Sequence, residues 1–109
     1  MKVKVMKDHA GEGQFPTFEE GAKVKIVGAE CAYYAGWFPC KINGHGTYIP
    51  GIYVREGKLT REYNPTELVQ KVGDVLTVQA IVYTWLLATN ASGETGWIPA
   101  EAVCGGMDE

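Results

Sequence analysis

Three cysteines and two histidines are the side chains that could bind a metal ion or act as nucleophiles in this chain: Cys31, Cys40, Cys104, His9 and His45. Structural zinc sites are usually built on short spacings such as Cys-x-x-Cys or His-x-x-x-His, and the sequence contains neither. A reactive cysteine needs a neighbouring cation or base, and Cys31 has no Lys or Arg close to it in sequence. The sequence therefore predicts no metal, no cofactor and no enzymatic activity.

The charge and the hydropathy pattern exclude several other classes of protein. The net charge is −3 and there is no run of Lys or Arg, which argues against a nucleic-acid-binding surface. Residues 1–7 alternate charged with apolar side chains, unlike a signal peptide, and the longest uncharged apolar stretch, residues 78–88, is too short to span a membrane. Together with the odd number of cysteines, this predicts a cytoplasmic protein with reduced thiols and no membrane partner.

Aromatic residues and prolines recur at a constant spacing. Trp37 is followed by Ile49-Pro50, and Trp85 is followed by Ile98-Pro99. The Trp-to-Pro separation is 13 residues in the first case and 14 in the second. Such self-similarity indicates an internal repeat. We therefore predict two domains, residues 1–56 and residues 57–109. Units of about 50 residues bury little core alone, so the two are expected to pack against each other.

The local patterns predict short strands. Fourteen glycines separate the apolar runs, Asn43-Gly44 is a strong hairpin signal, and Pro50 and Pro99 are expected to end strands because proline cannot donate to a ladder. No segment has a sustained helical period, so at most one turn of helix is expected after each of these prolines. The predicted fold class is all-β, with two small five-strand barrels.

The order of motifs resembles that of a Src-homology-3 (SH3) domain, most clearly in the second copy. The resemblance is carried there by Glu62-Tyr63, Glu67-Leu68 and residues 72–78, 85–88 and 93–99. The first copy resembles the same family in its ending, residues 49–54. Counting both copies, the resemblance covers about nine-tenths of the chain, and we predict a tandem pair of SH3-like domains.

The resemblance implies an aromatic groove that binds proline-rich peptides. On the first copy the corresponding positions are His9, Trp37, Pro50 and Tyr53, with Glu12, Glu19 and Glu20 as acidic residues that could recognise a basic end of the peptide. On the second copy they are Tyr63, Trp85, Pro99 and Ala102, with Glu67 as the acidic residue. Each copy departs from the family pattern, since His9 and Ala102 stand where aromatic rings are expected.

Three functions remain open from the sequence. The first is a non-catalytic module that binds a protein or peptide, proline-rich or basic, and the first copy is the better candidate because it keeps Tyr53 and the acidic loop. The second is a bacterial SH3-like module for cell-wall peptidoglycan. The third is a purely structural pair of barrels, in which Trp37 and Trp85 cover the seam between the copies. A nucleic-acid-binding barrel is the least favoured alternative because of the acidic balance.

Overall fold

The computed structural model describes residues 1–11 and 13–107 and confirms that the chain is all-β. Single 3-10 turns follow Pro50 and Pro99 as expected, at η1 (Gly51–Tyr53) and η2 (Ala100–Ala102). The strands are β1 (Lys2–Val5), β2 (Val24–Ile26), β3 (Trp37–Ile42), β4 (His45–Pro50), β5 (Val54–Arg55), β6 (Lys58–Leu59), β7 (Val75–Val82), β8 (Trp85–Thr89), β9 (Thr95–Pro99) and β10 (Val103–Met107). They form sheets of five, three and two strands, and none of these described sheets is closed into a barrel.

The chain folds as two compact units whose limits differ from the predicted division at residues 56 and 57. One, here called the split unit, comprises Met1–Gln14 and Thr66–Glu109. The other, the continuous unit, comprises Phe15–Pro65. The division differs because the N-terminal strand belongs with the C-terminal half of the chain.

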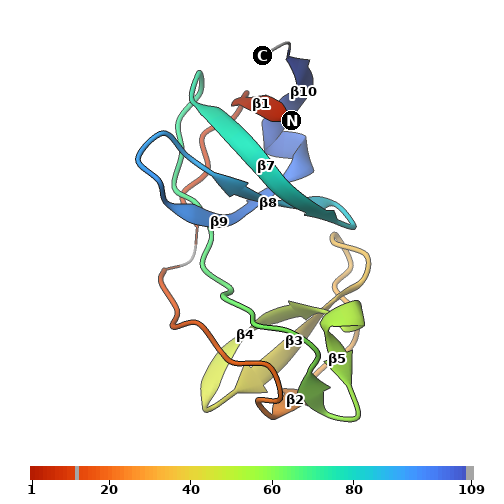
Figure 1. The fold of residues 1–109 in the computed structure, drawn as a ribbon. Coiled ribbons are helices and arrows are strands. Elements are labelled where there is room, and N and C mark those ends of the chain that lie inside the picture. Colours follow the sequence, from red (N-terminus) through yellow and green to blue (C-terminus); the bar gives the residue numbers. More distant parts are fainter. Residues whose placement is uncertain (12, 108–109) are drawn as a thin grey trace. The chain divides into compact units, whose positions relative to one another are not determined.

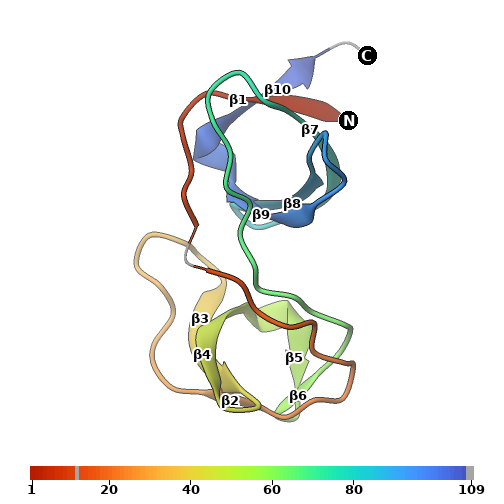
Figure 2. The ribbon, with the colours of Figure 1, turned by 90° about the vertical axis from the view of Figure 1, so that its left-hand side faces the viewer.

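The N-terminal strand β1 lies between β10 and β7 in the five-stranded sheet of the split unit, whose order is β10-β1-β7-β8-β9. Lys4 lies opposite Val75 of β7 on one side and Cys104 of β10 on the other. Figures 1 and 2 show this red strand among the teal and blue strands. Val3 and Val5 alternate with exposed lysines, so one face of β1 is buried in the core.

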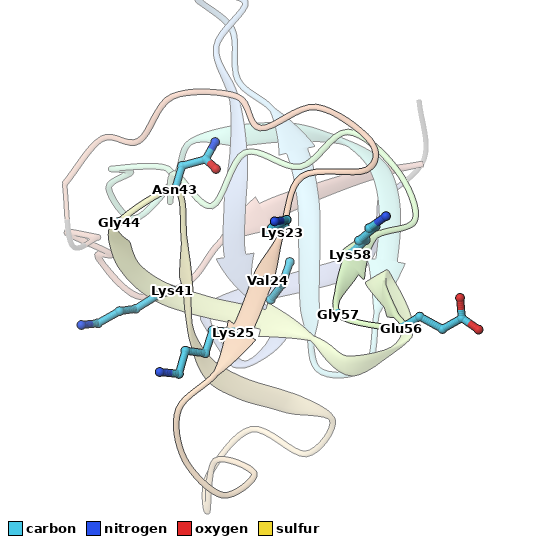
Figure 3. Close-up of a pocket in the computed structure, with 9 residues that line it drawn as sticks. All are labelled: Lys23, Val24, Lys25, Lys41, Asn43, Gly44, Glu56, Gly57 and Lys58. Carbon is cyan, nitrogen blue, oxygen red and sulfur yellow. The ribbon is translucent and has the colours of Figure 1, made fainter.

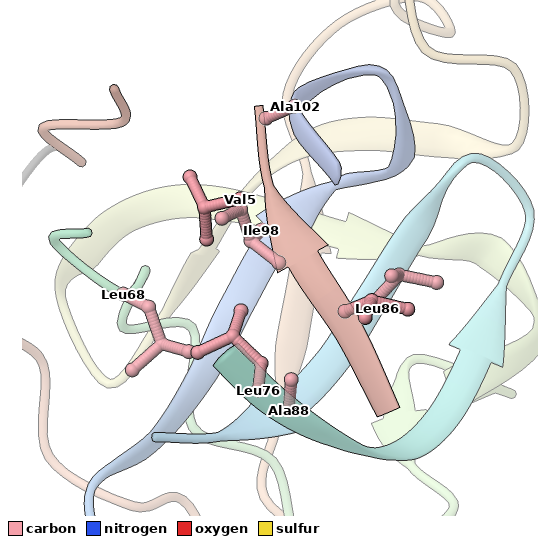
Figure 4. Packing of buried hydrophobic residues seen from close by; sticks show 8 residues of the cluster. Val5, Leu68, Leu76, Leu86, Ala88, Ile98 and Ala102 are labelled. Carbon is pink, nitrogen blue, oxygen red and sulfur yellow. The ribbon is translucent and has the colours of Figure 1, made fainter. Parts of the chain in front are cut away.

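The core of the split unit is built from both ends of the chain (Figure 4). Val3 and Val5 come from the first strand, and the remaining buried members come from the last 45 residues or so. The cluster consists of Val3, Val5, Leu68, Leu76, Leu86, Ala88, Ile98 and Ala102. The apolar face of β1 thus completes a core that the C-terminal half lacks on its own.

The continuous unit contains the sheet β2-β3-β4. The predicted hairpin at Asn43-Gly44 is confirmed, with both residues in the left-handed region (φ 49° and 83°) and Ile42 paired with His45. Two-residue turns of this kind match the twist of the flanking strands. The buried side chains of this unit include Phe18, Val24, Cys40, Ile42, Ile49 and Leu59.

A second two-residue turn, Glu56-Gly57, joins β5 to β6. Both turn residues have positive φ (52° and 74°), and Arg55 pairs with Lys58. Because the turn is so short, β6 can only fold back on β5. Lys58 also forms a bridge with Lys23, just before β2. The neighbour order β5-β6-β2-β3-β4 therefore matches the order β10-β1-β7-β8-β9 in the split unit.

The continuous unit thus contains β6, which comes from the second half of the sequence, and the split unit contains β1, which comes from the first half. We call this arrangement the strand exchange. After the Glu56-Gly57 turn only Lys58–Leu59 is a strand, and Tyr63 forms an isolated bridge with Phe18. Strand β7 is continuous over eight residues, and its register with β8 shifts between Val78 and Ala80.

The strand exchange makes a prediction that a linear arrangement of domains does not. We expect Val5→Ala, which removes two buried methyl groups, to destabilise the split unit by about 2 kcal/mol. Hydrogen exchange should show lost protection in β7, β8 and β9 and unchanged protection in β3 and β4. The matched control Val24→Ala should give the reverse pattern, and loss of protection in β3 and β4 on replacing Val5 would contradict the exchange.

Candidate functional site

The strand exchange regroups the residues that the sequence assigned to each groove. His9 lies in the split unit with Trp85 and Pro99, whereas Tyr63 lies in the continuous unit with Trp37, Pro50 and Tyr53. The sequence had placed His9 with Trp37 and Tyr63 with Trp85. Tyr63 therefore fills the aromatic position that is missing from the first copy, whereas the split unit has His9 and Ala102 where rings were expected.

The continuous unit contains an aromatic cluster built around Tyr53 and Tyr63. The two rings meet edge to face with centroids 5.6 Å apart, and the guanidinium of Arg61 lies 4.7 Å from the centroid of the Tyr53 ring. The Tyr63 hydroxyl donates a 2.6 Å hydrogen bond to the carbonyl of Tyr48. Trp37 lies opposite Pro50 across the β3–β4 ladder.

These rings lie in the interior. The exposed fractions of Trp37, Tyr53 and Tyr63 are 6%, 4% and 3%, and Pro50 is also buried. A polyproline helix needs open ring faces on which to lie. In this conformation the cluster offers none, and Tyr48 is the neighbouring ring that is exposed, at 47%.

The split unit contains a second, more accessible group, the His9–Glu67–Trp85 cluster. His9 Nε2 and Glu67 Oε1 are 2.7 Å apart, and the side chains are 18% and 20% exposed. The imidazole also meets the Trp85 ring edge to face at 5.9 Å between centroids. A carboxylate that solvent can reach thus lies next to a histidine that packs on an indole.

Backbone pairing holds this cluster in place. His9 and Gln70 exchange two backbone hydrogen bonds of 2.9 Å, and the amide of Val72 donates to Asp8 Oδ1 at 2.9 Å. Gly11 has φ of 69°, and a Cβ there would lie 3.2 Å from Glu67 Cβ. Glycine is therefore required for the two segments to approach so closely.

The buried side chain of Gln70 fixes the segment that carries Glu67. Its Nε2 donates to Asp74 Oδ2 at 2.7 Å, and its Oε1 accepts from Asn90 Nδ2 at 2.9 Å. Asn90 Oδ1 in turn accepts from the amides of Ser92 and Glu94. A buried amide satisfied on both sides rigidifies its surroundings.

The other predicted site residues lie elsewhere. Glu19 and Glu20 are exposed in a turn before β2 of the continuous unit, and Pro99 is buried at the end of β9. Glu12 lies outside the described residues. Sequence reasoning missed the grouping of His9 with Trp85, although the two-residue connection Glu56-Gly57 carried the signal for it.

Burial lowers the reactivity of two of the three cysteines, Cys31 and Cys40. Cys40 is 1% exposed, and burial raises the pKa of its thiol to about 11. Burial also raises the pKa of Cys31. In the part of the chain that the structure describes, no three His, Cys, Asp or Glu side chains converge as a metal site would require.

No protein-family model matches the chain, and no similar protein was found among curated sequences or solved structures. Within residues 1–11 and 13–107, no helix has the length and apolar character needed to cross a membrane.

The burial of Cys40 predicts the reactivity of the thiols. At pH 8 iodoacetamide should alkylate Cys40 roughly a hundredfold more slowly than the exposed Cys104, because the thiolate is the reactive form and little of it exists when the pKa is about 11. Mass spectrometry of the digested protein measures both rates. Equal rates in the folded protein would contradict the burial.

The same pKa makes stability depend on pH. The folded state favours the neutral Cys40 thiol, so its contribution is complete below the unfolded pKa of about 8.5 and is lost as the pH rises through about 11. Urea unfolding between pH 8 and pH 11 should show this loss, and Cys40→Ala should flatten that part of the curve.

Proposed function

We propose that this chain is a non-catalytic protein-interaction module made of two SH3-like units that exchange their first strands. Three features support the SH3-like assignment. Both units have the same neighbour order of strands, a 3-10 turn precedes the first strand of that order in each (β5 and β10), and an Ile-Pro pair ends the strand before that turn. The arrangement agrees with the order of motifs along the chain.

We place the peptide site at the His9–Glu67–Trp85 cluster. The observation that carries this choice is the partly exposed Glu67 carboxylate, held 2.7 Å from His9, whose own ring packs on the indole of Trp85. A carboxylate that solvent can reach suits an Arg or Lys side chain, which gains a charge-assisted hydrogen bond there, while the buried ring of Trp85 supports the imidazole of His9 from inside the unit. The proposed ligand is accordingly an extended peptide whose basic residue meets Glu67 and whose prolines lie farther along the peptide.

A structural role is the second candidate, and it concerns the continuous unit. The burial of Trp37, Tyr53 and Tyr63 favours rings that stabilise the fold rather than rings that bind a ligand. The sequence favoured a peptide site on the first copy. The site proposed here lies instead in the split unit, where the strand exchange brings together residues from both halves of the sequence.

A peptide titration tests the site. An isotope-labelled full-length chain is titrated with a ten-residue peptide that carries one terminal Arg and two prolines three residues apart. We expect amide shifts around His9, Glu67 and Trp85. Glu67→Gln should weaken binding roughly fivefold, because the charge of the carboxylate is lost.

Glu94→Gln is the matched control, because Glu94 is an exposed carboxylate in the same unit that accepts a hydrogen bond from Asn90. Its affinity should stay within twofold of the wild type. Equal weakening by both variants would contradict the site. Pelleting with peptidoglycan in the absence of any peptide-induced shift would favour the cell-wall alternative instead.

A further inference from the structure

Four lysines surround a pocket in the continuous unit (Figure 3). The pocket has a volume of about 620 Å³, and its polar lining consists of Lys23, Lys25, Lys41, Lys58, Asn43 and Glu56. The chain has 10 Lys and Arg residues in all against 13 Asp and Glu. A chain with an acidic balance therefore concentrates four of its ten basic side chains at one place.

Backbone pairing places these lysines directly opposite one another, so that their like charges repel. Lys25 lies directly opposite Lys41 in the antiparallel β2–β3 ladder, and Lys23 lies opposite Lys58 in an isolated antiparallel bridge. Residues directly opposite have Cβ atoms about 5 Å apart, and like charges at that distance are destabilising. The fold thus contains two such pairs side by side.

Nearby carboxylates do not compensate this charge. None of the four lysines forms an ion pair with a carboxylate among residues 1–11 and 13–107. Glu56 lines the pocket, but its carboxylate points away from the lysines in Figure 3. All four lysines are exposed, so that their ammonium groups can reach a ligand.

We propose that this pocket binds a compact ligand carrying clustered phosphates. In the free protein the two lysines of each pair repel each other. A multiply charged anion between the two pairs turns this arrangement of charges into a favourable one, since each ammonium then donates to a phosphate oxygen. A destabilising pairing that no neighbouring group offsets is a feature expected at functional sites.

The surroundings favour a compact ligand over a nucleic acid. The volume falls in the range of small-molecule sites, about 300–1,000 Å³. The nine described residues that line the pocket include no aromatic ring on which a base could stack. Binding to an extended nucleic acid also needs a basic stripe, which the net charge of −3 and the absence of any run of Lys or Arg in the sequence do not favour.

The strand exchange completes this site. Glu56 and Lys58 come from the β5–β6 turn and β6, whereas Lys25 and Lys41 come from β2 and β3. The tight turn brings Lys58 beside Lys23. The pocket lies in the continuous unit, so the experiment that tests it is independent of the peptide site in the split unit.

Titration of the full-length chain with inorganic tripolyphosphate at low salt tests the proposal. We expect amide shifts confined to residues 23–25, 41–44 and 56–58, and a higher melting temperature with the ligand bound. The double variant Lys25→Gln, Lys41→Gln should bind at least tenfold more weakly. Without ligand it should melt at a higher temperature than the wild type, because one like-charge pair is gone.

The control is the double variant Lys2→Gln, Lys4→Gln, which removes the same charge from exposed positions of β1. Its affinity should stay within twofold of the wild type. Equal weakening in both double variants would overturn the proposal, since it would show attraction by net charge alone.

Three further probes identify the source of the phosphates. Tighter binding of adenosine triphosphate or of inositol hexakisphosphate than of tripolyphosphate, with the same amide shifts, would support the proposal and indicate a nucleotide or an inositol phosphate respectively. Tighter binding of a 20-nucleotide single-stranded RNA, with shifts spread over both units, would overturn it in favour of a nucleic-acid surface.

Discussion

The rest of the structure depends on the two-residue turn at Glu56-Gly57. Because both residues have positive φ, the turn reverses the direction of the chain within two residues, and β6 therefore pairs with β5. Once β6 occupies that place, β1 is left to pair with β7 and β10 in the other unit. A constraint on two residues therefore decides which halves of the chain share a core.

The exchange changes what each unit can do. It brings Tyr63 to Tyr53 in the continuous unit, where the rings are buried, and it brings His9 to Trp85 in the split unit, where Glu67 stays accessible. It also brings Lys58 to Lys23. Neither the ring contacts nor the lysine pair at Lys23 would follow from two copies folded separately.

Local features of the fold could be predicted from the sequence, because they depend on neighbouring residues. Asn43-Gly44 specifies a hairpin through its tolerance of positive φ, and Pro50 and Pro99 end their strands for lack of an amide donor. The partner of β1 could not be predicted in the same way. The Val3 and Val5 pattern fits any half-buried position in a sheet, and pairing over a long sequence separation leaves no local signal. Whether the aromatic rings are open or covered stayed undecided from the sequence for the same reason, since the local pattern around a Trp or Tyr at a strand end is the same in both cases.

The pairing of the first strand with the last also sets an order of folding during synthesis. Every strand of the continuous unit lies between Phe15 and Pro65, so that its contacts are available before the second half is translated. β1 is made first, yet it lies opposite Cys104 and Val103. Its apolar face cannot pack before β7 has been made and is not fully paired before β10 has been made, because closing so long a loop precedes any contact that rewards it. Among the described strands, β1 is consequently the one whose edges stay unpaired for longest while the chain is made.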